Sequence, residues 1–160
     1  AQQSIKKKAE LGWDAQMHVS TTIASASVLA GEAVPKDAAK GALSIVHTKD
    51  VYNDALAGDA GFDAWRAFAA KHEGDVDAKS AISGTGYSTA QLLEAALTTM
   101  DGCTRADLAE AASNLKNVEL DLALNPVNTT PDYPYVTTEL NMQSFNGASW
   151  DVKPETYPIH

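Results

Sequence analysis

Apolar residues recur at helical spacing in several stretches of the chain. Near the N-terminus Ile5 and Ala9 stand among charged residues, and the pattern ends at Gly12, where glycine adopts a left-handed cap at least cost. Further along, Thr104 and Asp107 have the spacing of a capping box, with Asp in place of the usual Glu. These patterns predict helices over residues 2–11, 23–29, 63–72, 88–100 and 104–115.

Short apolar runs between the helices predict strands. A brief alternating run is expected to form a strand at residues 17–20, and a compact apolar run a buried strand at residues 42–46. The safest local prediction is a hairpin of residues 140–145 and 148–152, because Asn146-Gly147 tolerates the positive φ angles of a two-residue type I′ turn. Residues 31–40 and 47–59 are expected to be loops.

Composition sets the broad class of the protein. The chain has 160 residues, of which 44% are hydrophobic, so it is long and apolar enough to bury a core. Its formal net charge of −9 argues against a nucleic-acid partner, and the basic run Lys6-Lys7-Lys8 is interpreted as a solvated helix face. The single cysteine, Cys103, has no partner for an internal disulfide and no nearby histidine to activate it.

Catalytic and cofactor motifs are absent from the sequence. The histidines lie at positions 18, 47, 72 and 160, and none has the i, i+4 spacing of a zinc helix. Gly84-Thr85-Gly86 does not complete a dinucleotide fingerprint, and the sequence contains neither a nucleophile elbow nor a P-loop. The aromatic residues at helical spacing, Phe62, Trp65 and Phe68, are typical of a hydrophobic core, not of a cofactor site. We therefore expect no catalytic residue, no metal and no cofactor.

A polar site is predicted instead at one strand-to-helix turn. Ser20, Thr21 and Thr22 follow the strand expected at 17–20, at the end where open α/β sheets bind ligands. Their hydroxyls and free backbone N–H groups suit a polar ligand head. The alternative is that these three residues only cap the next helix.

Several short segments follow one another along the chain in a recognisable order: Glu10-Leu11-Gly12-Trp13, Ala39-Lys40-Gly41-Ala42, Phe62-Asp63-Ala64-Trp65-Arg66-Ala67-Phe68, Gly86-Tyr87-Ser88-Thr89-Ala90-Gln91-Leu92-Leu93 and Asn128-Thr129-Thr130-Pro131-Asp132-Tyr133. Taken in this order, they resemble the C-terminal part of the type I periplasmic binding proteins, the branched-chain amino acid group of ABC-transporter solute receptors. The resemblance runs from Gln3 to about Trp150. It implies an α/β fold: a partial type I fold with three-layer αβα elements and a C-terminal β-hairpin.

The resemblance also implies a domain plan. Receptors of this family have two α/β lobes, with three chain crossings between them and the ligand in the cleft. The 160 residues then represent a C-terminal fragment, with no initiator Met or signal peptide in the sequence given. Residues 1–55 correspond to second-lobe elements, residues 60–125 to elements crossing to the first lobe, and residues 126–160 to an extended return and the hairpin.

Further ligand contacts follow from the same resemblance. Lys49 and Asp50 lie past the strand that ends near His47, and Tyr87 matches the Gly-Tyr of the family near a crossing. The alternatives are a solvated Lys49–Asp50 loop pair and a tyrosine packed against its lobe with a wet hydroxyl. Amino acid receptors of the family commonly place an acidic residue for the ligand ammonium at the turn that here reads Val19 to Ile23 without Asp or Glu, which weighs against an amino acid ligand.

The implied function is an extracytoplasmic solute-binding component, periplasmic or lipid-anchored, that delivers a small polar solute, an amino acid or an amide-like molecule, to an ABC permease. The alternative from another class is a ligand-sensing domain of a receptor or regulator with the same fold. A small hydrolase or transferase is disfavoured, because no nucleophile with its base is visible. A sheet cut through its middle exposes an edge, so we also expect a homodimer of the fragment.

Overall fold

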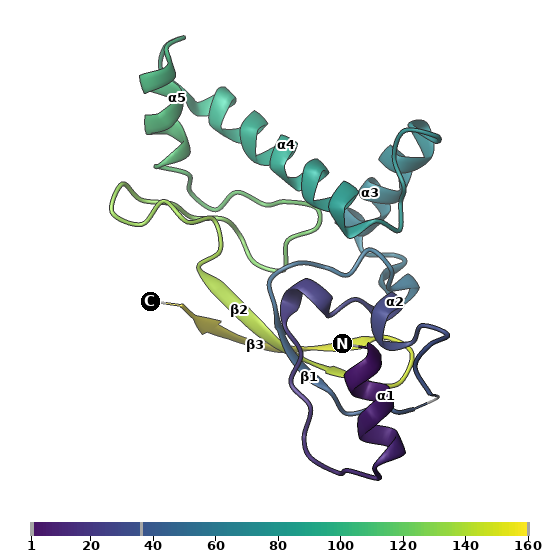
Figure 1. The fold of residues 1–160 in the computed structure, drawn as a ribbon. Coiled ribbons are helices and arrows are strands. Elements are labelled where there is room, and N and C mark those ends of the chain that lie inside the picture. Colours follow the sequence, from purple (N-terminus) through teal and green to yellow (C-terminus); the bar gives the residue numbers. More distant parts are fainter. Residues whose placement is uncertain (1, 36, 160) are drawn as a thin grey trace.

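The computed structural model describes residues 2–35 and 37–159, so Ala1, Lys36 and His160, which fall within the ranges considered above, lie outside the described residues. The sheet with α1 and α2 occupies one part of the molecule, and α3, α4 and α5 occupy the other (Figure 1). The helices are α1 (Gln2–Glu10), α2 (Ala26–Leu29), α3 (Ala60–Lys71), α4 (Ala81–Thr99) and α5 (Arg105–Ala112), with 3-10 turns η1 (Thr21–Ile23) and η2 (Asp54–Leu56). The strands are β1 (Leu43–Val46), β2 (Glu139–Phe145) and β3 (Trp150–Pro158).

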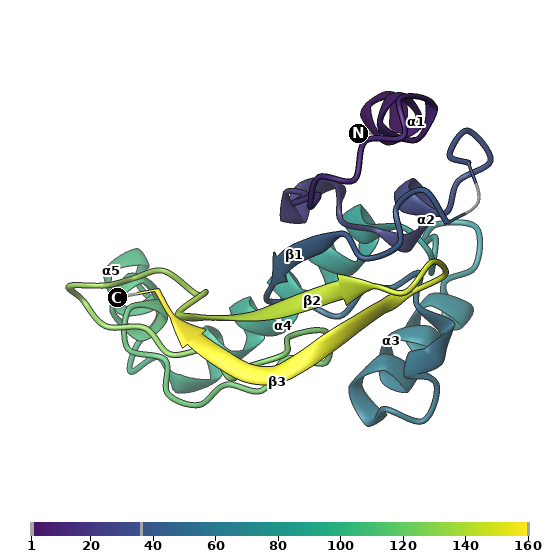
Figure 2. The same cartoon turned by 90° about the horizontal axis from the view of Figure 1, so that it is seen from below.

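The strands form one antiparallel sheet in the order β1-β2-β3. β3 is long and curves along the edge of the molecule (Figure 2). The hairpin is confirmed, but the type I′ turn is wrong: Phe145 pairs with Trp150 across a four-residue connection, in which Gly147 has φ of +109° and Asn146 is not at positive φ. Asn146 shapes this turn with its side chain, whose Oδ1 accepts from the N–H groups of Ala148 (3.0 Å) and Ser149 (2.9 Å).

The helices expected over 2–11, 63–72 and 104–115 are present, although α3 begins earlier, at Ala60, and α5 ends earlier, at Ala112. Their ends are set by local caps. At the end of α1, Gly12 has φ of +59°, and the N–H groups of Gly12 and Trp13 reach the carbonyls of Ala9 (3.1 Å) and Lys8 (3.0 Å), as in a Schellman motif. At the start of α5, Thr104 and Asp107 form the predicted capping box.

The helix expected over 88–100 begins earlier than predicted, at Ala81. Ser80 caps it, with its hydroxyl accepting from the N–H of Ser83 (3.3 Å). Gly84 is therefore helical. It is buried, and a Cβ added there would lie 3.0 Å from a methyl of Val51 and 3.1 Å from a methyl of Leu122. The absence of a side chain at Gly84 lets α4 pack close to Val51 and Leu122, which the prediction of a helix from residue 88 did not anticipate.

The strand expected at 17–20 is reduced to one parallel bridge, between His18 and Leu43. The ladder stops there because the Ser44 hydroxyl, at 2.9 Å, donates to the carbonyl of Val19. The helix expected over 23–29 is likewise divided into η1 and α2, separated by Ala24 and Ser25. The described residues of 31–40 form turns without a regular element, as expected, and the loop at 47–59 contains η2.

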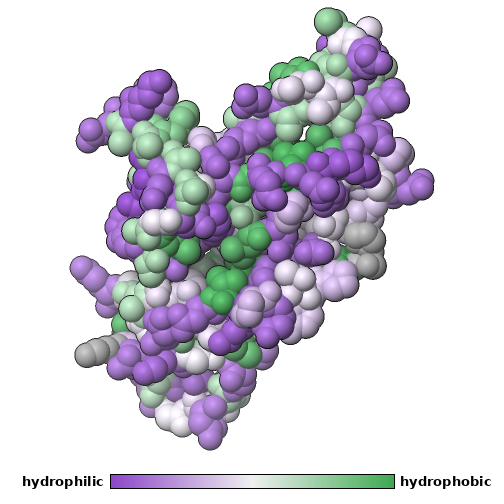
Figure 3. All heavy atoms as spheres, turned by 180° about the vertical axis from the view of Figure 1, so that it is seen from behind, coloured by the Kyte–Doolittle hydropathy of each residue, from purple (hydrophilic) through white to green (hydrophobic). Residues whose placement is uncertain are grey.

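The apolar core is divided into three clusters. One packs α1 and α2 against the hairpin around Ile5, Leu29, Phe145 and Trp150. The second surrounds Trp65 of α3, which is fully buried, and the third lies between α4, α5 and residues 115–127. Apolar side chains also remain at the surface and form a band across the rear face (Figure 3), and α4 exposes Ile82, Leu93 and Leu97.

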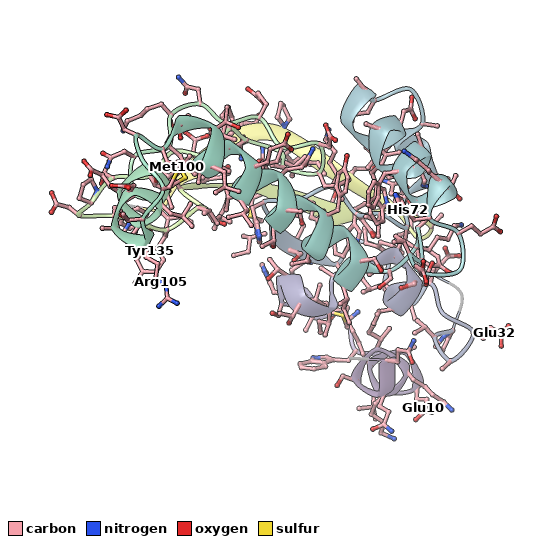
Figure 4. The ribbon with its side chains drawn as sticks, turned by 90° about the horizontal axis from the view of Figure 1, so that it is seen from above. Glu10, Glu32, His72, Met100, Arg105 and Tyr135 are labelled. Carbon is pink, nitrogen blue, oxygen red and sulfur yellow. The ribbon has the colours of Figure 1, made fainter. Side chains whose placement is uncertain are left out.

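Two short segments, residues 47–50 and 121–125, lie side by side between the sheet part and the helical part; we call them the connecting segments. They run antiparallel. The N–H of Lys49 donates to the carbonyl of Leu122 (2.8 Å), and the N–H of Leu124 donates to the carbonyl of His47 (3.0 Å). Figure 4 places Met100, Arg105 and Tyr135 at one end of the molecule and Glu10 and Glu32 at the other.

Candidate functional site

A cavity of about 560 Å³ opens where the connecting segments meet α4. That volume lies within the range typical of small-molecule sites. Hydroxyl side chains are its commonest polar lining groups, and they come from both sides of the molecule, from Thr21 and Thr22 before α2 to Thr85 and Thr89 on α4. The lining is drawn from residues 21–25, 46–51, 81–92, 120–127 and 136–143.

The structure brings four of the six predicted site residues to this cavity: Thr21, Thr22, Lys49 and Asp50. Ser20 lies just outside, and its hydroxyl is 3.0 Å from that of Thr22. Ser20 precedes η1 without a side-chain capping bond, so this turn is not held by a serine cap. Within the described residues, no protein group accepts a hydrogen bond from the backbone N–H of Thr21 or Thr22, which leaves both donors for a ligand or water.

Asp50 is engaged by the protein itself. Its Oδ2 accepts from the N–H of Ala26 (2.9 Å), and its Oδ1 accepts from the N–H of Tyr52 (3.0 Å) and the hydroxyl of Ser25 (3.4 Å). The carboxylate therefore ties the start of α2 to the connecting segment. Its negative charge is balanced by donors before any ligand arrives.

Lys49 and Asp50 do not form the solvated pair considered above. The Lys49 ammonium, with its side chain 14% exposed, donates to Asp59 Oδ1 (2.5 Å) and to the carbonyl of Asp121 (3.0 Å). Asp59 also caps α3 by accepting from the N–H of Phe62 (2.9 Å). The hydrogen bond from Lys49, and to a smaller extent the one from the Phe62 N–H, hold the pKa of Asp59 below its ordinary value.

Tyr87 does not line the cavity. Its ring packs against Trp65 and Phe68, with centroids 5.2 Å and 4.9 Å away. Its hydroxyl is not left to solvent, because it donates to Asp121 Oδ2 at 2.5 Å, an oxygen that also accepts from Gln91 Nε2 (2.7 Å). Burial, and then the neighbouring Asp121 carboxylate, raise the pKa of Tyr87 to about 12. Tyr87 thus fixes the second connecting segment on α4.

The polar lining residues that the sequence did not indicate include His47, Asn125 and Gln143. Burial lowers the pKa of His47, so its imidazole is uncharged at neutral pH. Gln143 is 2% exposed and stands on β2 opposite Ser44. Two of the buried positions of β2 carry amide side chains, Asn141 and Gln143. The alternation of apolar residues in a sequence cannot show that such polar side chains point inward.

Metal-binding clusters and membrane-spanning helices are both absent from the described part of the chain. Residues 2–35 and 37–159 contain no group of three or more His, Cys, Asp or Glu side chains arranged to hold a metal ion. In the same residues, no helix combines the length and the apolar character needed to cross a membrane.

Comparison of the fold with solved structures gives consistent matches, whereas no protein-family model and no curated protein matches the sequence. A branched-chain amino acid ABC transporter protein of Thermus thermophilus, solved with bound valine, matches 98% of this chain with a TM-score of 0.72 and 13% identity. A possible leucine/isoleucine/valine-binding protein of Rhodopirellula baltica matches 95% with a TM-score of 0.70 and 16% identity. An extracellular ligand-binding receptor of Rhodopseudomonas palustris matches 93% with a TM-score of 0.59 and 17% identity.

These matches cover only part of each similar protein: 43%, 39% and 43% of the three chains, respectively. They confirm the expected fold class, which the sequence segments had indicated. The chain therefore has the fold of part of a type I periplasmic binding protein of the branched-chain amino acid group, and it spans less than half the length of the structures that it matches.

Proposed function

We propose that this chain is part of an extracytoplasmic solute receptor that binds a small polar molecule, an amino acid or an amide-like compound, for delivery to an ABC permease. The cavity at the connecting segments carries the proposal. It has the volume of a small-molecule site, hydroxyl groups converge on it from separate elements, and two of the charged side chains that line it, Lys49 and Asp50, are already fixed in position. Binding and release, without covalent chemistry, are what such a lining performs.

The proposed contacts follow from the geometry. Thr21 and Thr22 offer hydroxyls and backbone N–H groups to the ligand, and Ser20 orients the Thr22 hydroxyl. Lys49 and Asp50 shape the wall, and Tyr87 acts behind it by holding Asp121. In this proposal the domain plan stated above, with divisions near residues 55 and 125, describes the pieces of a longer two-lobed receptor.

A second candidate is a ligand-sensing domain of a receptor or regulator. It is favoured by the likeness to extracellular ligand-binding receptors of Rhodopseudomonas palustris. The two candidates differ in their macromolecular partner, a permease in one case and a signalling protein in the other. A signal peptide with a lipid-attachment cysteine in the natural gene upstream of this segment would favour the transporter receptor.

Nuclear magnetic resonance titration of the isotope-labelled chain tests the proposal. Valine, leucine and isobutyramide are added in turn at millimolar concentration, and shifts of backbone amide signals are mapped on the fold. We expect at least one solute to shift residues 21–25 and 46–51 together. Replacing both Thr21 and Thr22 by Val removes two hydroxyls and is expected to weaken that binding about tenfold. The matched control is Thr98→Val on an exposed turn of α4, outside the cavity.

The proposal fails if no solute in the panel shifts the cavity residues at any concentration reached. It also fails if the shifts gather around Leu93 and Leu97, the exposed α4 side chains outside the cavity, and leave the connecting segments unchanged.

A further inference from the structure

Gln143 combines burial with an unused side chain. It is 2% exposed and lines the cavity. Among the described residues, no protein group forms a hydrogen bond with its side-chain amide. Among the described residues, Arg66 Nε and Trp150 Nε1 are the side-chain polar atoms that are both inaccessible to solvent and without a hydrogen-bond partner. The amide atoms of Gln143 do not belong to this group, so they keep some accessible surface toward the cavity. Buried amides in folded proteins are normally paired, and one that faces a cavity without a protein partner is a ready contact for a ligand.

The neighbouring amide, Asn125, points to the same kind of contact. Asn125 Nδ2 donates to Asn141 Oδ1 at 2.9 Å, and Asn141 in turn donates to the carbonyls of Lys153 (3.1 Å) and Glu155 (3.2 Å). These hydrogen bonds fix the orientation of the Asn125 side chain. The Oδ1 atom of Asn125 then remains as a hydrogen-bond acceptor at the cavity wall. The cavity thus presents a donor and acceptor at Gln143 and a further acceptor at Asn125.

Charge is scarce in the same cavity. Lys49 is paired with Asp59, Asp50 is held by N–H groups near α2, and Glu139 is exposed on the first residue of β2. His47 is uncharged, as described above. A ligand with a full charge would lose its hydration on entering and find no uncommitted opposite charge in the buried part of this wall.

We infer that Gln143 recognises the ligand and that this wall of the site selects an uncharged solute bearing a primary carboxamide. The inference rests on the proposed function and deepens it by naming the ligand class. A carboxamide offers an N–H to Gln143 Oε1 and accepts from Gln143 Nε2, so the two amides form a pair of parallel hydrogen bonds. A carboxylate has no donor for Oε1, and an ammonium has no acceptor for Nε2. Each charged group therefore satisfies only half of the glutamine.

Three probes of nearly equal size test the inference on the chain as it stands. Isobutyramide, sodium isobutyrate and isobutylammonium chloride are titrated into the labelled protein, and the Gln143 side-chain NH₂ signals are followed with the backbone amides of the cavity. We expect isobutyramide to bind about tenfold more tightly than either ion, because a charged probe leaves one buried polar group unpaired. Gln143→Leu should weaken isobutyramide about fivefold, whereas Gln3→Leu, on the exposed face of α1, should leave it unchanged.

The outcomes separate this inference from the proposed function. If either ion shifts the cavity residues at a concentration equal to or below that of isobutyramide, the carboxamide assignment is overturned while solute binding stands. If isobutyramide binds in the cavity without moving the Gln143 side-chain signals, the role of Gln143 is overturned. If none of the solutes shifts any cavity residue, both fail. The ranking of the three probes is measured on the unmodified chain and does not depend on how Gln143→Leu folds.

Discussion

Gly61 lies in the first turn of α3, against the second connecting segment, and its replacement by Ala tests how the two parts of the molecule are joined. A Cβ at this position would stand 2.3 Å from the carbonyl oxygen of Asp121, 2.7 Å from its Cα and 2.9 Å from its carbonyl carbon. All three are backbone atoms. No rotamer change can relieve the overlap, so α3 and the connecting segment must separate by about 1 Å to restore ordinary contact distances.

The magnitude follows from two opposing effects. Alanine is favoured over glycine inside a helix by about 1 kcal/mol. Overpacking in a close-packed contact costs about 1–3 kcal/mol, and more where the backbone must move. The separation also loosens Phe62 and Trp65, which are 2% and 0% exposed and lie beside Gly61 on α3. The overlap wins, and we expect Gly61→Ala to lower the free energy of unfolding by about 2 kcal/mol, or the midpoint temperature by about 4–8 °C.

Urea denaturation followed by tryptophan fluorescence measures this change, with Gly86→Ala as the matched control. Gly86 is also in a helix, α4, and a Cβ there would meet nothing within 4 Å. Only the helix preference remains, so Gly86→Ala should raise stability by about 0.5–1 kcal/mol. Equal stabilisation by both substitutions would refute the close packing of α3 on the connecting segment.

Three further predictions concern the polar contacts and the sheet. Tyr87→Phe removes the 2.5 Å hydrogen bond to Asp121 and should lower the free energy of unfolding by about 1–2 kcal/mol. The control Tyr157→Phe, at an exposed position of β3, should leave stability unchanged, and similar urea midpoints for the two variants would contradict the prediction. Because bonding to Lys49 lowers the folded-state pKa of Asp59, this carboxylate stabilises the fold above its unfolded pKa, and the stabilisation disappears as the pH falls through the folded pKa. Asp59→Asn keeps a helix cap, so a flatter loss of stability below about pH 5 is expected, and a slope equal to the wild type would refute it. Light scattering should detect the homodimer expected from the cut sheet, and a monomer at high protein concentration would count against it.

Local signals in the sequence predicted local structure well. The capping box at Thr104 and the left-handed cap at Gly12 depend on residues within one helical turn, and both formed as expected. The start of α4 was missed because Gly84 serves a contact with Val51 and Leu122, residues distant in the sequence. The strand at 17–20 was overestimated for the same reason, since only the fold shows that a serine on β1 ends its ladder.

The lining of the cavity was predicted in part. Thr21 and Thr22 were predicted from the rule that ligands bind at strand ends, and Lys49 and Asp50 from the family resemblance; all four line the cavity. The resemblance did not indicate that the last two would be committed to Asp59 and α2. Gln143 could not be found, because a polar residue in a hairpin is ordinarily directed to solvent, and its burial is decided by residues about a hundred positions earlier in the chain.

The connecting segments have a mechanical consequence. Side by side, joined by the bonds of Lys49 with Leu122 and of Leu124 with His47, they resist sliding along their length but oppose bending only weakly. We therefore expect bending between the sheet part and the helical part to occur at these segments. The cavity has walls on both parts, so its width changes with the bending angle, and a solute that touches both walls stiffens the joint.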